Sequence, residues 1–454
     1  DILLVHLFVF WFALLSTITP PVCGTVFIAS GMVNENWVKV SITSMILGLG
    51  LYFIPLGMVS NPSLIKLGST PIEALIAMFK ISIFNSILYI FSMFISEIKI
   101  DTYNIPLPEP VEAYAAGVMK SFDLVVCRIT NDDEVEGVGY ITVHENQGKA
   151  IAQIIKDSFI NLLKNKDPRY IEYLWNLMWK KVHYAGRGAP VSFAIAAVDV
   201  ALWDLKGKYL NEPLWSLLGG YQKNVLCYAG NIDLNFSKDK LLAEATKSLD
   251  QGFRAIKMRL GRETLKEDLE RLDAMRSHLP SDVSLMADAN EAWSVNQAMK
   301  AFNEIEKFNL VWLEEPIKPD DFEGYKYLRS LGKVPIAAGE NLHTLAEMNL
   351  LIKHNGVDYV EPDLTTCGGI TTYMKVAKLA EINNLPVVSH GVHELHVHLL
   401  AACPNASYME FHAWRIDDYI EEKLSINNGY SPAPDKPGHG VVFDFEKLSK
   451  LKID

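Results

Sequence analysis

Seven apolar runs in the second half of the chain each end in a charged or ionisable residue, at nearly constant intervals. The steps from Asp288 to Glu314 and from Glu314 to Glu340 are 26 residues each, and the neighbouring steps run from 20 to 31 residues. That spacing fits one strand, one helix and two loops, so it predicts functional side chains along one rim of a barrel. The run-ending residues are Lys257 with Arg259, Asp288, Glu314, Glu340, Asp363, His390 and Glu410.

Strand-like and helix-like segments alternate strictly from about Val225. Alternating units imply parallel strands with right-handed crossovers, and this many units would close into a TIM-like barrel. An open doubly wound sheet is the alternative, but it would gather ligand groups mainly at one switch point. We therefore expect an α/β fold with a barrel domain over residues 225–425.

Residues 97–224 follow a different pattern, in which strand-like runs precede helical runs without alternation. This order predicts an α+β domain. Within it, the run APVSFAIAAVDVALWDLKGKYL has helical spacing, and Pro213 follows its end. Residues 426–454 lack the repeat, and we expect them to pack back on the α+β domain.

The first 96 residues have a charge balance of zero, so the net charge of −12 belongs to residues 97–454. Three apolar stretches, 2–18, 38–59 and 71–95, approach the roughly 20 residues that cross a membrane. They predict a helical transmembrane segment, whereas a signal peptide would show one short apolar run and a cleavage site. Because the chain begins with Asp1, we expect it to be part of a longer protein.

The stretches PPVCGTVFIASGMVNENW and LGLGLYFIPLGMVSNPSLI resemble the end of the fused membrane subunit of TRAP transporters, which import organic and sugar acids. Too few spans remain to form a transport path, and no intramembrane carboxylate pair indicates a coupling site. We interpret residues 1–96 as a permease remnant. An organic-acid transporter that carries the barrel as a passenger is the alternative.

Charge and cysteine content exclude other classes of protein. An acidic region does not neutralise phosphates, so we expect no nucleic-acid partner. The five cysteines are scattered without a Cys-x-x-Cys pair, which argues against a disulfide framework or a zinc knuckle and favours a reducing cytosol. We expect an enzyme in the cytoplasm, with possible membrane attachment through residues 1–96 and a homo-oligomer formed by the enzyme part.

Three carboxylates end consecutive predicted strands, namely Asp288, Glu314 and Glu340. Hard anionic oxygens without Cys or His partners suit Mg²⁺. A single acid at such a place would more often cap a helix, but three at matched positions favour a metal site. Strand alternation should turn Glu315 away, so we take Glu314 as the ligand.

The segment HGVHELHVH contains His-Glu-x-His, which lacks the spacing that puts two zinc-binding histidines on one helical face. We expect His393, His396 and His398 to be packing or loop residues.

The motifs K-x-R, D-x-N, E-E-P, G-E-N, P-D-x-x-x-G-G, S-H and M-E occur in this order over the second half of the chain. In order and spacing they resemble the mandelate racemase subgroup of the enolase superfamily, also called mandelate racemase/muconate lactonizing enzyme-like, and in particular its acid-sugar dehydratases. The resemblance covers residues 97–454. It implies an α+β capping domain over a modified (β/α)₇β barrel, and removal of a proton α to a carboxylate with the help of Mg²⁺.

The resemblance assigns Asp288, Glu314 and Glu340 to the metal. It makes His390 a base that Asp363 orients, and a carboxylate beside an imidazole does fix the tautomer and raise the basicity. The simpler interpretation is that His390 is a hydrogen-bonded loop residue and that Asp363 holds a turn.

Other residues would bind the substrate. The resemblance gives Glu410, in its protonated form, and Lys257 to the substrate carboxylate, and Asn290 to the site lining; Glu410 could instead be a helix cap. Residues 106–122 would form a lid over the barrel mouth. Arg187 is a candidate for a distal hydroxyl or second carboxylate, or else an ordinary surface arginine.

One departure from the family pattern affects the reaction. Family racemases have a second lysine two residues after the first, where this chain has Arg259. Since a guanidinium is not deprotonated in proteins, it cannot be the second base that racemisation requires. Dehydration needs one base and an acid, and His390 can act as both in turn. Arg259 would then clamp a carboxylate or hydroxyl.

We therefore predict a Mg²⁺-dependent hydro-lyase that dehydrates a sugar acid, either an aldonate or an aldarate, to a 2-keto-3-deoxy acid. The alternatives are a racemase or epimerase of the same family, the transport protein described above, and a non-catalytic sugar-acid binder in which Arg259 has disabled turnover.

Overall fold

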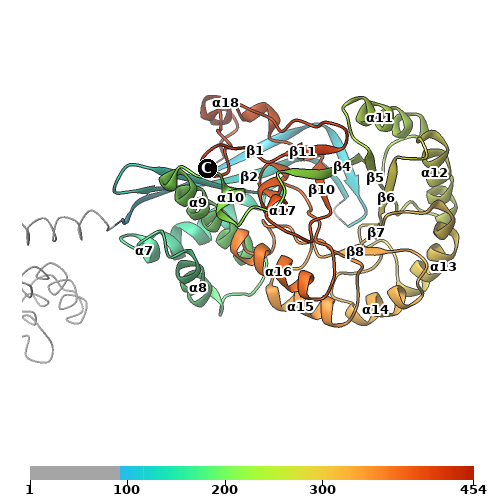
Figure 1. The fold of residues 1–454 in the computed structure, drawn as a ribbon, viewed down its shortest axis with the longest axis horizontal. Helices are drawn as coiled ribbons and strands as arrows, with labels where there is room; N and C mark the ends of the chain where they lie inside the picture. Colours follow the sequence, from blue (N-terminus) through green and yellow to red (C-terminus); the bar gives the residue numbers. More distant parts are fainter. Residues whose placement is uncertain (1–92, 116, 454) are drawn as a thin grey trace, which may run out of the picture. The chain divides into compact units, whose positions relative to one another are not determined.

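The computed structural model describes residues 93–115 and 117–453 (Figure 1). The predicted membrane stretches 2–18 and 38–59, and nearly all of 71–95, lie outside the described residues, as does the permease-like sequence. Within the described ranges, no helix combines the length and apolar character needed to cross a membrane. The first described strand begins at Ile95, so the expected boundary after residue 96 falls inside a strand.

The capping part begins with a three-stranded antiparallel sheet. Its strands are β1 (Ile95–Ala113), β2 (Gly117–Asn131) and β3 (Glu136–His144). Helix α9 (Val191–Leu210) packs so closely on this sheet that a Cβ added to Gly139 would lie 2.1 Å from the carbonyl oxygen of Ala197. The other helical segments are α6 (Gly148–Ile154), η2 (Ile155–Phe159), α7 (Ile160–Leu163), α8 (Ile171–Val182) and α10 (Leu214–Leu217).

The predicted lid at residues 106–122 is not an irregular loop. Strands β1 and β2 continue through most of it and pair as far as Ala113 and Gly117. Apolar side chains that alternate along the hairpin explain the difference, because Val111, Ala113 and Met119 form a small buried cluster. The lid is therefore the end of a β-hairpin.

Seven parallel strands follow, in the spatial order β10-β4-β5-β6-β7-β8-β9. The curled sheet closes through residues 387–389, where the Val388 amide donates to Val360 and the Ser407 amide donates to Val387. Eight strand positions thus complete a ring. The strands are β4 (Asn224–Ile232), β5 (Ala255–Arg259), β6 (Ser284–Asp288), β7 (Leu313–Glu314), β8 (Ile336–Ala338), β9 (Tyr359–Val360) and β10 (Tyr408–His412).

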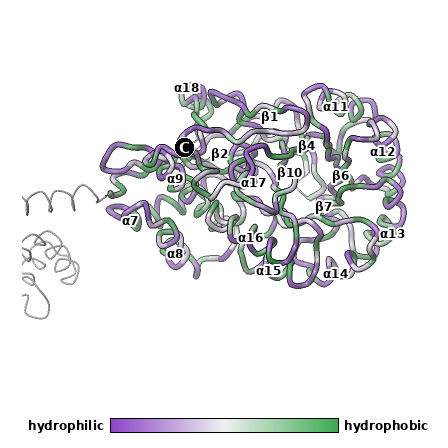
Figure 2. The backbone as a smooth tube through the Cα atoms, in the orientation of Figure 1, coloured by the Kyte–Doolittle hydropathy of each residue, from purple (hydrophilic) through white to green (hydrophobic). Residues whose placement is uncertain are grey.

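Helices connect the strands and cover the outside of the ring (Figure 1). Amphipathic spacing explains their orientation, and in α13 the buried residues are Ala298, Ala301, Phe302 and Ile305. Figure 2 shows the corresponding alternation of hydrophilic and hydrophobic positions along the outer helices. The helices are α11 (Lys238–Asp250), α12 (Leu265–His278), α13 (Val295–Ile305), α14 (Phe322–Ser330), α15 (Leu345–Lys353), α16 (Ile370–Ile382) and α17 (His393–Ala401), with the short η3 (Glu306–Phe308) after α13.

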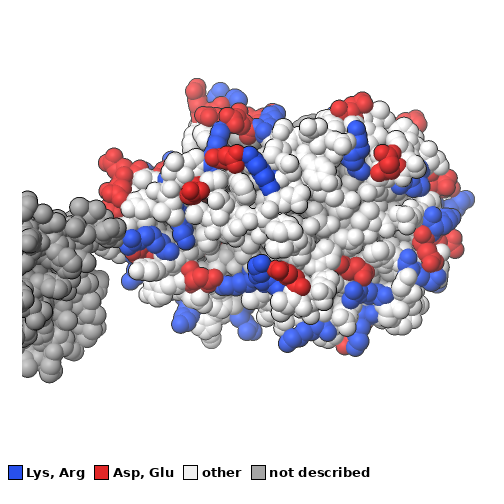
Figure 3. Space-filling model, viewed as in Figure 1, with Lys and Arg blue, Asp and Glu red and all other residues white. Residues whose placement is uncertain are grey.

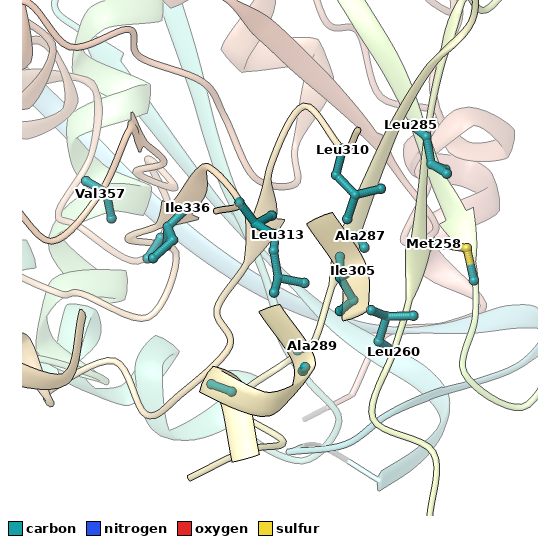
Figure 4. Close-up of a cluster of buried hydrophobic side chains, with 14 of the residues drawn as sticks. Met258, Leu260, Leu285, Ala287, Ala289, Ile305, Leu310, Leu313, Ile336 and Val357 are labelled. Carbon is teal, nitrogen blue, oxygen red and sulfur yellow. The ribbon is translucent and has the colours of Figure 1, made fainter. Parts of the chain in front are cut away.

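Two apolar layers stabilise the ring. The outer layer lies between strands and helices and includes Met258, Leu285 and Leu313 (Figure 4). The inner layer fills the ring itself and contains Tyr228, Ala255, Met286, Trp312, Ala337 and Val388. The interior is therefore a packed core beneath one open rim.

Residues 426–453 contact both parts of the described structure, whereas the sequence predicted that residues 426–454 pack on the cap alone. Strand β11 (Tyr430–Pro432) pairs antiparallel with β4 of the ring. The chain then passes through α18 (Phe445–Ser449) to the cap sheet, where the Ile453 amide donates to the carbonyl oxygen of Thr102. The pairing of β4 with β5 begins only at Ala229, so the first residues of β4 can pair with β11, a ring contact that the sequence pattern did not indicate.

On the face shown in Figure 3, Lys and Arg side chains alternate with Asp and Glu side chains around a largely uncharged centre. This face of the described residues carries no continuous basic patch of the kind that follows a nucleic-acid backbone.

Candidate active site

The carboxyl ends of parallel strands meet at one rim, and the predicted site residues lie there. A cavity of about 310 Å³ opens at this rim, beneath the cap. Five of the predicted residues line it, namely Arg259, Asn290, Glu340, Asp363 and His390. The other rim residues are buried, namely Lys257, Asp288, Glu314 and Glu410. A larger hollow of about 750 Å³ between cap and barrel helices contains none of the predicted residues.

The ammonium of Lys257 lies among three carboxylates. Its Nζ is 2.5 Å from Oε1 of Glu314, 3.0 Å from Oε1 of Glu410 and 3.8 Å from Oδ2 of Asp288. Burial acts to lower the pKa of Lys257, but the carboxylates outweigh it and raise the pKa well above its usual value. Lys257 is therefore a fixed cation at the base of the site.

Replacement of this cation should destabilise the fold. We expect Lys257→Met to lower the free energy of unfolding by about 3 to 5 kcal/mol, because Glu314 and Glu410 would be left buried without their partner. Urea unfolding followed by tryptophan fluorescence, with a chelator present, measures the change. Lys300→Met, on the exposed side of α13, is the control and should change stability by less than about 0.5 kcal/mol. Equal stability of both variants would contradict the assignment.

The predicted metal trio is only partly assembled by these side chains. Glu314 and Glu340 converge with Glu361, so that one oxygen of each lies within 4.8 Å of the others. Asp288 is not in that group; its Oδ2 lies 3.8 Å from Nζ of Lys257, and its Oδ1 accepts the backbone amide of Asn290 at 2.8 Å. Asp288 and Glu314 nevertheless both lie within 4 Å of Nζ of Lys257, so their carboxylates face the same positive charge.

Glu361 is a residue that the sequence analysis missed. It directly follows β9 and is fully buried, with only a 3.5 Å contact to the hydroxyl of Tyr228. The sequence did contain a signal for Glu361. It lies two residues before Asp363, and in an extended chain residues two apart turn their side chains to the same face.

Glu315 does not turn away from the site as strand alternation predicts. Its φ of 35° places it in the left-handed region, which bends the backbone at the end of β7. Glu315 consequently lines the cavity and accepts a hydrogen bond from Nδ2 of Asn341 at 2.7 Å. Glu314 instead points toward the packed interior of the ring, where Nε1 of Trp312 donates to its Oε2 at 3.0 Å. Both glutamates are thus candidate ligands.

The donor set around the rim fits a hard divalent cation. Several buried oxygens there have no hydrogen-bond donor, and unpaired buried acceptors are unfavourable unless a cation or donor meets them. Oxygen ligands in this number suit Mg²⁺. The oxygens are Oδ1 of Asn290, Oε1 of Glu315, Oε2 of Glu340, Oε2 of Glu361 and Oε1 of Glu410, the last of which has its ion pair with Lys257.

His390 lies between two carboxylates at the cavity wall. Its Nδ1 is 3.0 Å from Oδ2 of Asp363, and its Nε2 is 3.4 Å from Oε2 of Glu340. Thr365 fixes Asp363, because its amide and hydroxyl both donate to Oδ1. Burial lowers the pKa of His390, but Glu340 and Asp363 raise it to about 10. The geometry leaves Nε2 as the nitrogen that faces the cavity.

Glu410 differs from the expectation that it is protonated. Burial raises its pKa, but Lys257, His412 and His390 lower it, and the net pKa lies below the usual range. Its Oε2 also accepts the Gly391 amide at 2.9 Å. The buried ammonium at 3.0 Å favours the ionised form of Glu410, and a spacing argument could not reveal that contact.

Arg259 contacts the protein on the side of the lid. Its Nη1 donates to Oδ1 of Asp233 at 3.0 Å and to the carbonyl oxygen of Glu112 at 3.3 Å. Asp233 directly follows β4. That strand is not one of the seven apolar runs that end in an ionisable residue, so Asp233 was not predicted. Arg259 therefore joins the lid to the barrel and also lines the cavity. The sequence predicted only a clamp on the substrate.

The remaining predictions divide. Arg187 is exposed in the segment before α9 and does not line the cavity. His393, His396 and His398 lie on helix α17, so the loop interpretation is wrong and the packing interpretation holds. His396, for example, accepts the Leu364 amide at 3.1 Å and lies 2.9 Å from the Gly391 carbonyl.

The cap contributes cavity residues that carry no periodic or charge signal in the sequence. They are Ala113, Ala115, Met119, Thr142, Val143, His144, Gln147, Ala189 and Phe193.

Comparisons with known proteins agree with this arrangement. Residues 96–219 match the N-terminal domain of the mandelate racemase / muconate lactonizing enzyme family, and residues 240–448 match the enolase C-terminal domain-like family. The 3,6-anhydro-alpha-L-galactonate cycloisomerase of Streptomyces coelicolor is 44% identical over 360 residues, which is 79% of this chain and 99% of that protein.

Two solved structures also match. A racemase from Streptomyces coelicolor with bound magnesium has a TM-score of 0.78 and 43% identity, and the match covers 79% of this chain and all of that chain. The L-talarate dehydratase from Polaromonas, complexed with Mg and L-glucarate, has a TM-score of 0.74 and 33% identity, covering 80% and 98%. Magnesium in both supports the predicted metal. The comparisons give no support to the permease resemblance of residues 1–96.

Proposed function

Because the chain belongs to the mandelate racemase / muconate lactonizing enzyme family of the enolase superfamily, we propose that it removes the proton α to the carboxylate of a sugar acid and then eliminates the β-hydroxyl as water. The product is a 2-keto-3-deoxy acid. The observation that carries the proposal is the His390–Asp363 pair at the cavity wall, opposite an arginine that cannot serve as a second base.

The residues have separate tasks in this reaction. Nε2 of His390 takes the α-proton, while Asp363 holds Nδ1 and keeps the ring oriented. His390 then returns that proton to the departing β-hydroxyl, so one residue acts first as base and then as acid. Lys257 supplies fixed positive charge beside the substrate carboxylate. The cap and lid exclude water from the cavity.

Asp288, Glu314 and Glu340 are the proposed magnesium ligands, with Glu315 as the competing donor. The ion would supply positive charge where negative charge develops on the substrate carboxylate. Glu340, shared between such an ion and His390, would then raise the pKa of His390 less than it does alone, which favours His390 as a proton acceptor.

The test uses the full chain with magnesium and a panel of sugar acids. We expect 2-keto acid to form, together with exchange of the α-proton in D₂O. Exchange with inversion at the α-carbon and no loss of water would contradict dehydration and favour a racemase or epimerase. Absence of both product and exchange would favour a non-catalytic binder.

Cycloisomerisation is the second candidate, because the relative that is 44% identical over 99% of its length carries that name. In that case the oxygen lost from the β-carbon is a ring ether of the same molecule, and the product is an isomer of the substrate. Mass spectrometry separates the two, since dehydration lowers the product mass by one water and ring opening leaves it unchanged.

A further inference from the structure

The cap side of the cavity is poor in charge, in contrast to the rim side. Its lining residues are mostly alanine, aromatic and aliphatic, and its polar groups are Thr142, His144 and Gln147. Trp414 continues this wall from beyond β10, with its ring 5.1 Å from that of His144. Among the described residues that line the cavity, the only arginine or lysine is Arg259, and it is paired with Asp233.

Cations nearby in the sequence do not reach this wall. Lys120, Lys149 and Arg187 follow or precede lining residues by one or two positions, but each is exposed and none of them lines the cavity. In the hairpin, strand alternation explains the outcome, because Met119 turns inward and Lys120 turns outward.

The charged groups bonded behind the wall are acids. Asp123 is buried and accepts the Gly148 amide at 2.9 Å, next to Gln147. Glu145 accepts a hydrogen bond from the hydroxyl of Ser121 at 2.7 Å. Burial and the neighbouring His390 and Arg259 lower the pKa of His144, which disfavours its charged form. A carboxylate placed at this wall would have acids behind it, and among the described lining residues the only lysine or arginine is Arg259 on the rim side.

We propose that the substrate is a monocarboxylic sugar acid, with its single carboxylate at the rim and neutral hydroxyl or ether groups at the cap wall, and not a dicarboxylic acid. This inference deepens the proposed function and rests on it for the placement of the first carboxylate. A second carboxylate would lose part of its hydration against the apolar residues of the cap wall without gaining a cationic partner, which is the kind of penalty that separates close substrate analogues. Thr142 and Gln147 would hydrogen-bond the distal hydroxyls.

The experiment compares galactonate with galactarate, two acids of six carbons that differ in the second carboxylate. Calorimetry with the full chain and magnesium should show galactonate binding at least about 100-fold more tightly. Where both acids turn over, kcat/KM should show the same preference. Equal or tighter binding of galactarate would overturn the inference. Turnover without that preference would leave the proposed function intact, whereas binding with the preference but no α-proton exchange would contradict only the proposed function.

A pair of variants tests the cause. Gln147→Arg places a guanidinium at the cap wall and should improve galactarate binding by at least about tenfold relative to galactonate. Gln147→Met has a similar length without charge and should not tighten galactarate binding, whereas Arg187→Met removes the exposed arginine and should leave the ratio of the two affinities unchanged. If Arg187→Met weakened galactarate binding selectively, Arg187 would be a carboxylate ligand and the inference would be wrong.

Discussion

His390→Asn is expected to lower kcat by about 10³- to 10⁴-fold, since one residue supplies both the base and the acid of the reaction. Magnesium affinity should change little, because Asn is smaller than His and the carboxylates of the metal site remain. Both product formation and α-proton exchange should be lost together, since the first step needs Nε2. A stopped-flow or steady-state assay of 2-keto acid measures product formation, and NMR in D₂O measures exchange of the α-proton.

His354→Asn is the matched control, because His354 lies at the C-terminal end of α15 near the exposed Glu323 and away from the cavity. It should retain full activity. Retention of product formation by His390→Asn would remove the central feature of the mechanism. Loss of product with continued α-proton exchange would identify a different base and leave His390 as the acid alone.

Glu340→Gln is expected to weaken magnesium binding by at least about 100-fold and to lower activity in proportion at limiting metal. Its Oε2 makes no hydrogen bond and has Nε2 of His390 at 3.4 Å, and loss of the charge removes a ligand oxygen that faces the cavity. Calorimetric titration with MgCl₂ gives the affinity. Glu323→Gln, on the exposed side of α14, is the control, and unchanged magnesium affinity in Glu340→Gln would contradict the ligand assignment.

The same titration separates the neighbouring glutamates. If Glu314 is the ligand, Glu314→Gln should lose magnesium affinity by a similar factor, whereas Glu315→Gln should lose at most about tenfold. The reverse order would show that the bend at the end of β7 brings Glu315 to the metal and that strand alternation misled the sequence analysis.

Much of the site could be predicted because it repeats. Asp288, Glu340, Asp363 and His390 follow successive strands, and parallel strands in a ring bring their ends to one rim. No comparable regularity exists in the cap. His144 is the last residue of β3 and Gln147 lies in the turn after it, and only packing of the cap over the rim makes them cavity residues.

Several side-chain partners also escaped prediction. The contact of Lys257 with Glu410 joins residues 153 positions apart, and it lowers the pKa of Glu410, whereas the sequence analysis expected a protonated carboxyl. Arg259 likewise contacts Asp233 and the lid, whereas the sequence predicted that it contacts the substrate. Such contacts depend on which rotamers fill a crowded interior.

The sequence by itself determined the alternation of strands and helices, the presence of an ionisable residue at nearly every strand end, and the substitution of arginine for the second base. Periodicity along the chain is a local property, so these features follow from spacing and residue type. Only the tertiary structure decided which carboxylates converge, which cation neutralises them and how little charge the cap wall carries. Those properties depend on distances between residues far apart in the chain, and the free energy of a buried charge is set by its neighbours in space.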